Sequence, residues 1–246
     1  SVVIVLSGLL LSMAHLPVTA HQHMVYPTAD WRMSTPEEQG MDSADLARLL
    51  EVVVGNHIPF DSVLVTRHGY VVLDVSVPPF DMHTPHALYS VTKSVIATLV
   101  GIAIDQGLIE GVHQSIWDFF PREATANMDE RKADITVQDL LTQRSGLGFR
   151  AGHRSDHYWL GEDDQSWVQY ILDRPMSAQP GTTFDYEEGN PHLLSAIIRQ
   201  ASGMSTREFA QRYLFNPLGI TDVIWPADPQ GIQVGGSELF LSASDI

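Results

Sequence analysis

The chain reads Leu88-Tyr89-Ser90-Val91-Thr92-Lys93-Ser94 at the start of a long apolar segment that runs to Gln106 and stops at Gly107. On a helix, the side chains of this segment would leave no wholly polar face, and a helix of that kind lies in the core of a globular protein. Glycine directly after the last apolar turn is a common helix end. We therefore predict a long buried helix over residues 90–106 at the centre of the fold.

Ser90 and Lys93 lie three residues apart, so on this helix their side chains share one face. Burial and the positive end of the helix dipole both favour the neutral form of a lysine in the first turn. A neutral amine can take the proton of a serine hydroxyl and make the serine a nucleophile. Free N–H groups at the helix start can hold an oxyanion. The pattern therefore indicates a nucleophile and its basic partner.

A structural alternative exists, in which Ser90 only caps the helix and Lys93 extends its amine to water. However, a capping box has Glu or Gln, not lysine, three residues after the cap. Lysine is also scarce in this sequence, where Lys93 and Lys132 are the only two. Both observations favour the functional interpretation of the pair.

Upstream of this helix, the sequence predicts a helix and a hairpin. Ser43 can cap a helix that ends at Gly55. The stretches Ser62–Thr66 and Tyr70–Val75 are rich in residues that favour strands. Arg67-His68-Gly69 between them suits a tight turn, so the two stretches are predicted to pair as a hairpin.

Downstream, the pattern is helical and interrupted. Short helices are predicted at residues 115–120, 137–142, 166–172 and 206–214. A longer helix is predicted with Asn190 as cap and Pro191 at its first position, ending at Gly203. Gly235-Gly236 is predicted to be a flexible break, and Ser244-Asp245 to open a further helix. The order of strands, one central helix and a helical block indicates an α/β (α+β) fold.

Composition limits the function classes. With 14 basic against 30 acidic residues, the formal net charge is -16, so nucleic acids and anionic membranes are poor partners. The absence of cysteine excludes disulfides, thiolate metal sites and a cysteine nucleophile. A proline separates His83 from His86, and the group of His153, Asp156 and His157 lacks the His-Glu-x-x-His pattern of zinc enzymes. We expect no metal and no cofactor.

The N-terminal segment has the pattern of a secretion signal. Residues Val2–Leu16 are apolar, and Val18 and Ala20 fit a signal-peptidase site before His21. The apolar run is shorter than the roughly 20 residues that a transmembrane helix needs. We predict a signal peptide over residues 1–20 and export to the periplasm or the extracellular space. The alternative is that the run is a buried strand or helix of the fold.

With the apolar helix behind it, Leu88–Ser94 resembles the motif of serine β-lactamases and penicillin-binding proteins. More narrowly, it resembles the β-lactamase-related serine hydrolases, which include class C β-lactamases, esterases and 6-aminohexanoate-oligomer hydrolases. Other segments resemble the same group, and they are Ser34–Met41, Asp134–Leu147, Pro180–Tyr186 and Phe215–Ile220. The resemblance covers the chain from about residue 30 to its end.

This resemblance implies a β-lactamase/transpeptidase-like fold, with an antiparallel sheet, flanking helices and an all-helical subdomain. It implies that residues 21–110 form the first part of the α/β domain, residues 111–230 the helical subdomain and residues 231–246 the return to the α/β domain. The family's third motif, Lys-Thr-Gly or a variant of it on a strand, is not found in the sequence. We expect that strand, and the other C-terminal strands of the sheet, beyond Ile246.

The family's second motif is a tyrosine followed two residues later by Asn or Ser. Tyr186 fits the tyrosine, and the resemblance implies that it assists proton transfer between Ser90, Lys93 and the leaving group. Glu188 takes the place of the Asn, and an anion beside Lys93 would favour the ammonium form and give Tyr186 more of the proton transfer. Alternatively, Glu188 points away and Asn190 supplies the amide. Glu188 and Asn190 are therefore the predicted substrate-binding residues, and a helix cap is the alternative role of Asn190.

The function that the resemblance implies is a serine hydrolase that cleaves a carboxylic ester or small amide through an acyl-enzyme on Ser90. β-Lactamase or D-alanyl-D-alanine carboxypeptidase-like activity on a lactam or peptide is the first alternative. A non-catalytic binder or sensor on the same fold is the second, because fold does not dictate activity. No serine has glycine both two residues before and two after it, so the nucleophile elbow of α/β-hydrolases is absent. Ser145 is interpreted as a loop residue.

Overall fold

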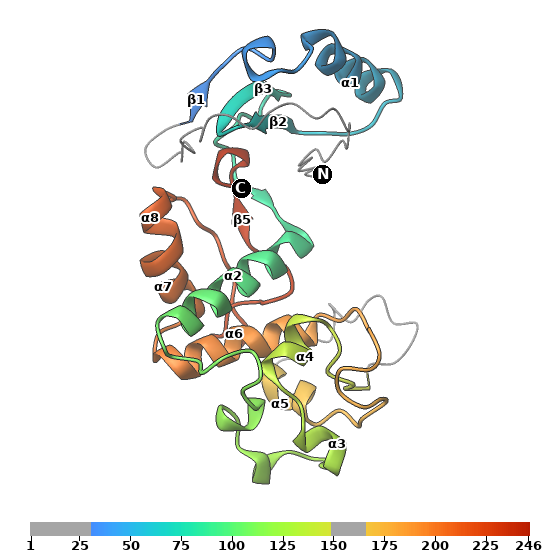
Figure 1. Ribbon diagram of the computed structural model, residues 1–246, viewed down its shortest axis with the longest axis vertical. Coiled ribbons are helices and arrows are strands. Elements are labelled where there is room, and N and C mark those ends of the chain that lie inside the picture. Colours follow the sequence, from blue (N-terminus) through green and yellow to red (C-terminus); the bar gives the residue numbers. More distant parts are fainter. Residues whose placement is uncertain (1–30, 149–165) are drawn as a thin grey trace, which may run out of the picture. The chain divides into compact units, whose positions relative to one another are not determined.

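The computed structural model describes residues 31–148 and 166–246 (Figure 1). The predicted signal peptide and the group of His153, Asp156 and His157 lie outside these residues. The described helices include none that is both long and apolar enough to cross a membrane.

Contacts divide the chain into two compact units. Of the described residues, the first unit contains 31–86, 218–222 and 241–246, and the second contains 87–217 and 223–240. The central helix belongs to the second unit, because it packs on the helical block. Every residue of the predicted site therefore belongs to the second unit.

The first unit contains helix α1 (Ser43–Gly55), as predicted, but its cap is Asp42 and not Ser43. The Asp42 carboxylate accepts a hydrogen bond from the N–H of Ala44 at 2.8 Å. Aspartate is as good a cap as serine, and here it is the residue with extended backbone angles (φ -100°, ψ 119°). Ser43 lies one residue inside the helix, where its N–H donates to the Glu37 carboxylate at 2.9 Å.

A three-stranded sheet completes this unit, in the order β1 (Arg32–Met33), β3 (Tyr70–Ser76), β2 (Ser62–Arg67). β2 and β3 run antiparallel from the pair Ser62–Ser76 to the pair Arg67–Tyr70, which confirms the predicted hairpin. His68 and Gly69 form its turn with φ angles of 53° and 81°, the positive values that a tight hairpin turn requires. β1 is parallel to β3.

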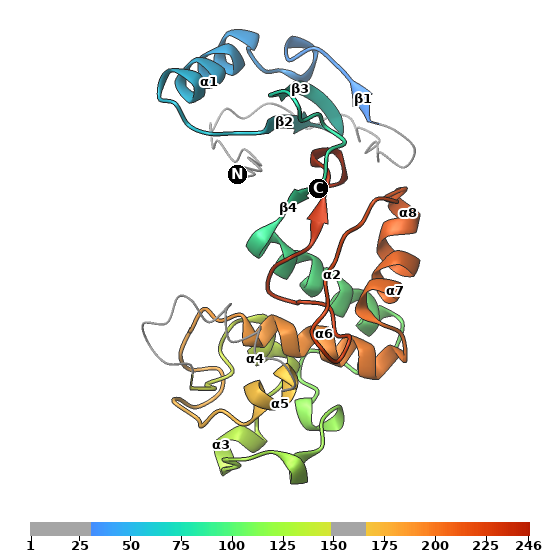
Figure 2. The same ribbon diagram turned by 180° about the vertical axis from the view of Figure 1, so that it is seen from behind.

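A separate two-stranded sheet is formed by β4 (His86–Ala87) and β5 (Phe240–Leu241) (Figure 2). Beside it, the N–H of Leu88 donates to the carbonyl of Leu239 at 2.8 Å. The N–H of Leu239 in turn donates to Oγ1 of Thr92 at 3.4 Å. The residues on both sides of Ser90 are therefore tied to the segment that enters β5.

The central helix, α2 (Thr92–Asp105), begins two residues later than predicted. Ser90 lies in a 3₁₀ turn, Tyr89–Val91, and its side chain caps no helix N–H. Gly107 follows the helix end with φ 69°, as predicted. The expectation of burial on all sides is wrong for one face, because small and polar residues there are exposed, namely Ser94, Ala97, Thr98, Gly101 and Asp105. The opposite face is buried through Thr92, Ile96, Leu99, Val100 and Ala103.

The helical block surrounds α6 (Gly189–Ser202), which contacts α2 and three shorter helices and lies at the middle of this unit in both views (Figures 1 and 2). Residues Gly189 to Ile198 are all buried. The shorter partners are α4 (Val137–Leu141), α5 (Trp167–Leu172) and α7 (Thr206–Ala210). Thr136, Ser166 and Ser205 cap these three helices.

Four details of the block differ from the predictions. Residues 115–120 contain only a 3₁₀ turn at Ile116–Asp118, and an unpredicted helix, α3, lies at Glu130–Ala133. The predicted helix over 206–214 ends as α7 at Ala210 and continues as a π-helical turn, Gln211–Phe215, into α8 (Asn216–Leu218). Asn190 is not the cap of α6, because the helix already begins at Gly189 with Glu188 before it.

Gly235 and Gly236 are buried, so the prediction of a flexible break is wrong. A Cβ atom on Gly235 would lie 2.1 Å from the carbonyl oxygen of Pro191 in α6. The two glycines instead permit the backbone of this segment to approach the start of α6 closely.

Candidate active site

Ser90 and Lys93 are in contact, as their spacing predicts. Lys93 Nζ lies 3.2 Å from Ser90 Oγ, within hydrogen-bond distance. Ser90 is presented by the 3₁₀ turn and Lys93 by the first turn of α2. Tyr89, directly before the serine, has φ 45°, a left-handed backbone angle that non-glycine residues adopt rarely. Strained backbone of this kind is frequent next to reactive groups.

Lys93 has two further acceptors. Its Nζ lies 2.7 Å from Oε1 of Glu188 and 2.8 Å from the carbonyl oxygen of Gly236. The side chains of Lys93 and Glu188 are only 14% and 17% exposed. With Ser90 Oγ, each of the three N–H bonds of an ammonium group therefore has an acceptor. Of the two orientations predicted for Glu188, the structure has the one beside Lys93.

Tyr186 lies over the lysine. Lys93 Nζ is 4.8 Å from the centre of the Tyr186 ring, close enough for a cation–π interaction. The tyrosine is 53% exposed, and its ring lies 6.5 Å from that of Phe184. The structure thus brings Tyr186 to Lys93, and its part in proton transfer stays a prediction.

Asn190 lies apart from these groups. It is 1% exposed, and its Nδ2 donates to Oε1 of Gln143 at 2.7 Å. In the described part of the chain, no hydrogen bond joins Asn190 to Lys93 or Ser90. Its amide is therefore turned towards α4 and not towards the serine, and its role in substrate binding stays a prediction.

Gln143 is a residue of the site region that the sequence did not reveal. Its Nε2 donates to the carbonyl of Glu187 at 3.0 Å, and its Oε1 accepts from the N–H of Glu187 at 3.2 Å. Its own carbonyl accepts from the N–H of Asp185 at 2.9 Å. Gln143 thereby holds the backbone on both sides of Tyr186 and just before Glu188.

Gly236 is the other residue that was missed. Its carbonyl binds Lys93, and a Cβ atom on it would lie 1.7 Å from Oε2 of Glu188. Only glycine leaves room for the carboxylate in this arrangement. The signal in the sequence is the pair of adjacent glycines, which marks a close approach of backbone as readily as a flexible break.

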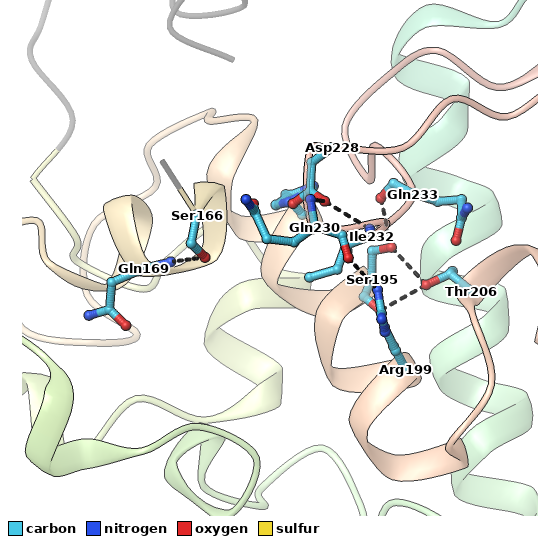
Figure 3. A network of polar contacts seen from close by, with 10 residues as sticks. Ser166, Gln169, Ser195, Arg199, Thr206, Asp228, Gln230, Ile232 and Gln233 are labelled. Atoms are coloured by element: carbon cyan, nitrogen blue, oxygen red, sulfur yellow. Dashed lines mark hydrogen bonds and ion pairs between the residues drawn. The ribbon is translucent and has the colours of Figure 1, made fainter. Parts of the chain in front are cut away.

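A polar network, buried except at Arg199 and Gln230, holds the segment before these glycines along α6 (Figure 3). Nε2 of His192 lies 3.1 Å from Oδ2 of Asp228, and Oγ of Ser195 donates to the carbonyl of Gln233 at 2.8 Å. The guanidinium of Arg199 donates to the carbonyl of Gln230 at 2.8 Å. The segment that delivers the Gly236 carbonyl to Lys93 is therefore fixed at several points.

Asp228 is the charged centre of this network. Burial would raise the pKa of its carboxyl, but hydrogen bonds from His192 and from the N–H of Ile232, together with the positive charge that His192 can carry, lower it overall. The N–H of Ile232 donates to the other carboxylate oxygen at 2.8 Å. Asp228 is therefore bound most strongly in its ionised form.

The histidines do not form a metal site in the described residues. Among residues 31–148 and 166–246, no three His, Asp or Glu side chains are grouped so that they could hold a metal ion. His86 is buried with its Nδ1 3.4 Å from the Asp61 carboxylate, and Nδ1 of His83 lies 3.5 Å from Ser244 Oγ.

Comparison with known proteins gives one family match. The family model described as Beta-lactamase matches residues 38–235. The chain is 28% identical over 163 residues to an ML-236A carboxylate methylbutanoyltransferase of Penicillium citrinum, covering 60% of this chain and 39% of that protein. It is 31% identical over 94 residues to a lovastatin esterase of Penicillium rubens, covering 36% of this chain and 23% of that protein.

Among solved structures, the chain is similar to EstCE1, described as a hydrolase with promiscuous acyltransferase activity. The TM-score is 0.67 at 17% sequence identity, covering 85% of this chain and 71% of EstCE1. At that identity the likeness concerns the fold. The chain spans less than half the length of the curated relatives named above.

Proposed function

Because the chain belongs to the Beta-lactamase family, we propose that it is a serine hydrolase that cleaves a carboxylic ester or a small amide through an acyl-enzyme on Ser90. The observation that carries the proposal is the contact between Ser90 Oγ and Lys93 Nζ, 3.2 Å apart. A serine becomes a nucleophile when an adjacent group takes its proton, and this contact provides that group.

The proposed reaction has two stages. Ser90 Oγ attacks the carbonyl carbon while its proton passes to Lys93, and the backbone N–H of Ser90 donates to the oxyanion that forms. The leaving alcohol or amine takes up the proton, with Tyr186 assisting from its position over the lysine. Water then attacks the acyl-enzyme, and the acid is released with Ser90 restored.

We propose an ester as the first substrate class and a small amide as the second. The similar lovastatin esterase and EstCE1, which is described as a hydrolase, support this order. A β-lactam or a D-alanyl peptide is the alternative. Turnover of p-nitrophenyl esters without turnover of nitrocefin is expected, and the opposite result would reverse the order.

Acyl transfer to an alcohol is a second candidate. The similar protein from Penicillium citrinum is named a methylbutanoyltransferase, and EstCE1 is described as having promiscuous acyltransferase activity. The same acyl-enzyme serves both outcomes, because the second nucleophile is either water or an alcohol. Product analysis with an added alcohol acceptor distinguishes the two, since transfer gives a new ester in place of the acid.

Labelling with a fluorophosphonate probe tests the proposal directly. We expect the wild-type protein to react covalently at Ser90 and Ser90→Ala to lose all labelling. Ser94→Ala is the matched control, because Ser94 is exposed on α2 and is not one of the residues that contact Lys93 Nζ in the described structure. A wild-type protein that neither labels nor turns over any ester would instead support a non-catalytic binder.

We also propose that the protein is exported, on the pattern of residues 1–20. Mass spectrometry of the mature protein is expected to find His21 at its N-terminus. Retention of residues 1–20 would contradict export by cleavage at this site.

A further inference from the structure

Glu188 has one carboxylate oxygen on Lys93 and one that is unpartnered. Oε1 accepts from Lys93 Nζ at 2.7 Å, whereas Oε2 is buried and has no hydrogen-bond partner in the described structure. A buried carboxylate oxygen without a partner is costly, and most such groups in proteins are satisfied. A carboxyl group with such an oxygen is less costly to bury when it carries a proton than when it is charged.

The surroundings hold the carboxylate against the lysine. Gly236 lies on one side, so close that a Cβ atom there would be 1.7 Å from Oε2. Glu188 also directly precedes α6, a helix of 14 residues. The positive end of the helix dipole favours an anion at that place. The arrangement therefore suits an anionic group next to Lys93, with little free space on the side of Gly236.

We propose that Lys93 and Glu188 act together as the base for Ser90, with Glu188 holding the extra proton while the acyl-enzyme forms. The proposal rests on the proposed function, and it assigns a proton-holding role to Glu188. Glu188 acts through Lys93 in this role and is therefore a positioning residue, and its part in substrate binding stays a prediction.

Each proton that moves in this mechanism has a named donor and a named acceptor. At rest the pair carries Lys93 as ammonium and Glu188 as carboxylate. A proton moves from Lys93 to Oε1 of Glu188 across their 2.7 Å contact, and the neutral amine then takes the proton of Ser90 as its Oγ bonds to the carbonyl carbon. The tetrahedral intermediate thus faces an ammonium and a protonated carboxyl. When the bond to the leaving group breaks, Lys93 gives that group a proton, and Glu188 returns its own to the lysine.

Within residues 31–148 and 166–246, three groups lie against Lys93 Nζ besides the Glu188 carboxylate. They are Ser90 Oγ from the 3₁₀ turn, the Tyr186 ring from the loop before α6, and the carbonyl of Gly236. Tyr186 is the rival acceptor for the serine proton. A test must therefore separate a carboxylate that holds a proton from one that only orients Lys93.

Glu188→Gln makes that separation. The amide oxygen of glutamine can still accept a hydrogen bond from Lys93, but it cannot accept a proton. If Glu188 holds the proton, kcat/KM falls by about 10²–10⁴-fold with little change in KM, the range typical of general base catalysis. The low-pH limb of kcat/KM also moves to higher pH, because Lys93 must now lose its proton to solvent first. Glu188→Asp retains a carboxylate and is expected to keep the limb in place.

Glu238→Gln is the matched control. It is the same substitution, with the same loss of one negative charge, at an exposed residue two positions after Gly236. Its rate and pH profile are expected to equal those of the wild type. Unchanged activity in Glu188→Gln would overturn the proposal. Equal losses in Glu188→Gln and Glu188→Asp without any movement of the limb would also overturn it, in favour of a purely orienting ion pair.

A readout independent of activity is available because the sequence has only two lysines, Lys93 and Lys132. With ¹³C at the lysine ε position, the NMR spectrum holds two lysine signals, and Lys93→Met assigns them. The Lys93 signal is expected to show a pH-dependent step that reports its contact with the Glu188 carboxylate, and that step disappears in Glu188→Gln. A Lys93 signal without the step would overturn the pairing. Failure of Ser90 to label in the wild type, with the step intact, would instead overturn the proposed function.

Discussion

Gln143 shows at the scale of a single residue why part of the site could not be predicted. Glutamine is usually exposed, but Gln143 is buried and bonded to Glu187 and Asn190, which lie 44 and 47 residues further along the chain. No local pattern marks such a residue, because its partners are decided by packing. The Ser90–Lys93 pair could be predicted, since both residues lie within one helical turn.

Lys132 is the other lysine, and it is fully buried. Its Nζ donates to the carbonyls of Ala126 and Leu172 at 2.9 and 2.8 Å. Burial lowers the pKa of Lys132 below its ordinary value of 10.5, although the charges of Asp173 and Asp129 oppose this. The Lys132 amine therefore links two parts of the helical block, and the loss of its hydration opposes the stability that this link provides.

Lys132→Met is predicted to change how stability depends on pH. Between the lowered pKa and 10.5, the folded protein binds fewer protons at Lys132 than the unfolded chain does. The contribution of Lys132 to the free energy of unfolding therefore increases as pH rises through this window, by about 1.4 kcal/mol for each unit by which the pKa is lowered. The measurement is urea denaturation of both proteins at several alkaline pH values.

The control for this prediction is Arg122→Met, which removes a positive charge from an exposed side chain. Its free energy of unfolding is expected to follow that of the wild type at every pH. A constant difference between Lys132→Met and wild type across the alkaline range would show that Lys132 titrates alike in the folded and unfolded states.

At the scale of elements, the starts of helices were the least predictable feature. Asp42 and Glu188 precede α1 and α6, where the sequence suggested Ser43 and Asn190 as caps. At α1, adjacent polar residues compete for the cap and the backbone angles of the folded chain decide between them, whereas Glu188 before α6 has helical backbone angles and caps no N–H. The hairpin and the end of α2 at Gly107 were predictable because positive φ angles demand particular residues there.

Gly235→Ala is predicted to damage both stability and activity. The new Cβ would lie 2.1 Å from the Pro191 carbonyl, so the segment must move away from α6. Overpacking of this kind costs about 1–3 kcal/mol. The Gly236 carbonyl moves with the segment, which deprives Lys93 of an acceptor and lowers kcat/KM. Thermal unfolding and ester turnover of the variant check the two effects.

Gly101→Ala serves as the comparison. Gly101 lies inside α2, and apart from the backbone of the helix itself no atom of the described structure lies within 4 Å of the place that a Cβ would take. Alanine is favoured over glycine inside helices, so a gain of up to about 1 kcal/mol is expected with activity unchanged. If Gly235→Ala were as stable and active as Gly101→Ala, the close approach of the segment to α6 would be refuted.

At the scale of the whole molecule, the predicted fold class is confirmed by the family match over residues 38–235 and by the likeness to EstCE1. The sequence could indicate this because several motifs, from Ser34–Met41 to Phe215–Ile220, are spread along the chain. It could not indicate that one face of α2 is exposed in the described structure, or that Gly235-Gly236 is packed.

The net charge of -16 predicts a dependence of stability on salt. An excess of one charge sign makes the folded protein repel itself, and mobile ions screen this repulsion. Raising the salt concentration from about 20 to about 150 mM is therefore expected to raise the melting temperature. Sodium chloride and potassium chloride should act equally if screening is the cause. A melting temperature that is constant or falls would show that attractive charge pairs outweigh the net repulsion.

The fit of Gly236 against Glu188 also constrains how this protein can evolve. A side chain at position 236 would force the Glu188 carboxylate away from its place beside Lys93, whereas a shorter residue at position 188 would leave room for it. The effect of a substitution at position 236 is therefore expected to depend on the residue at position 188, which makes the two positions epistatic.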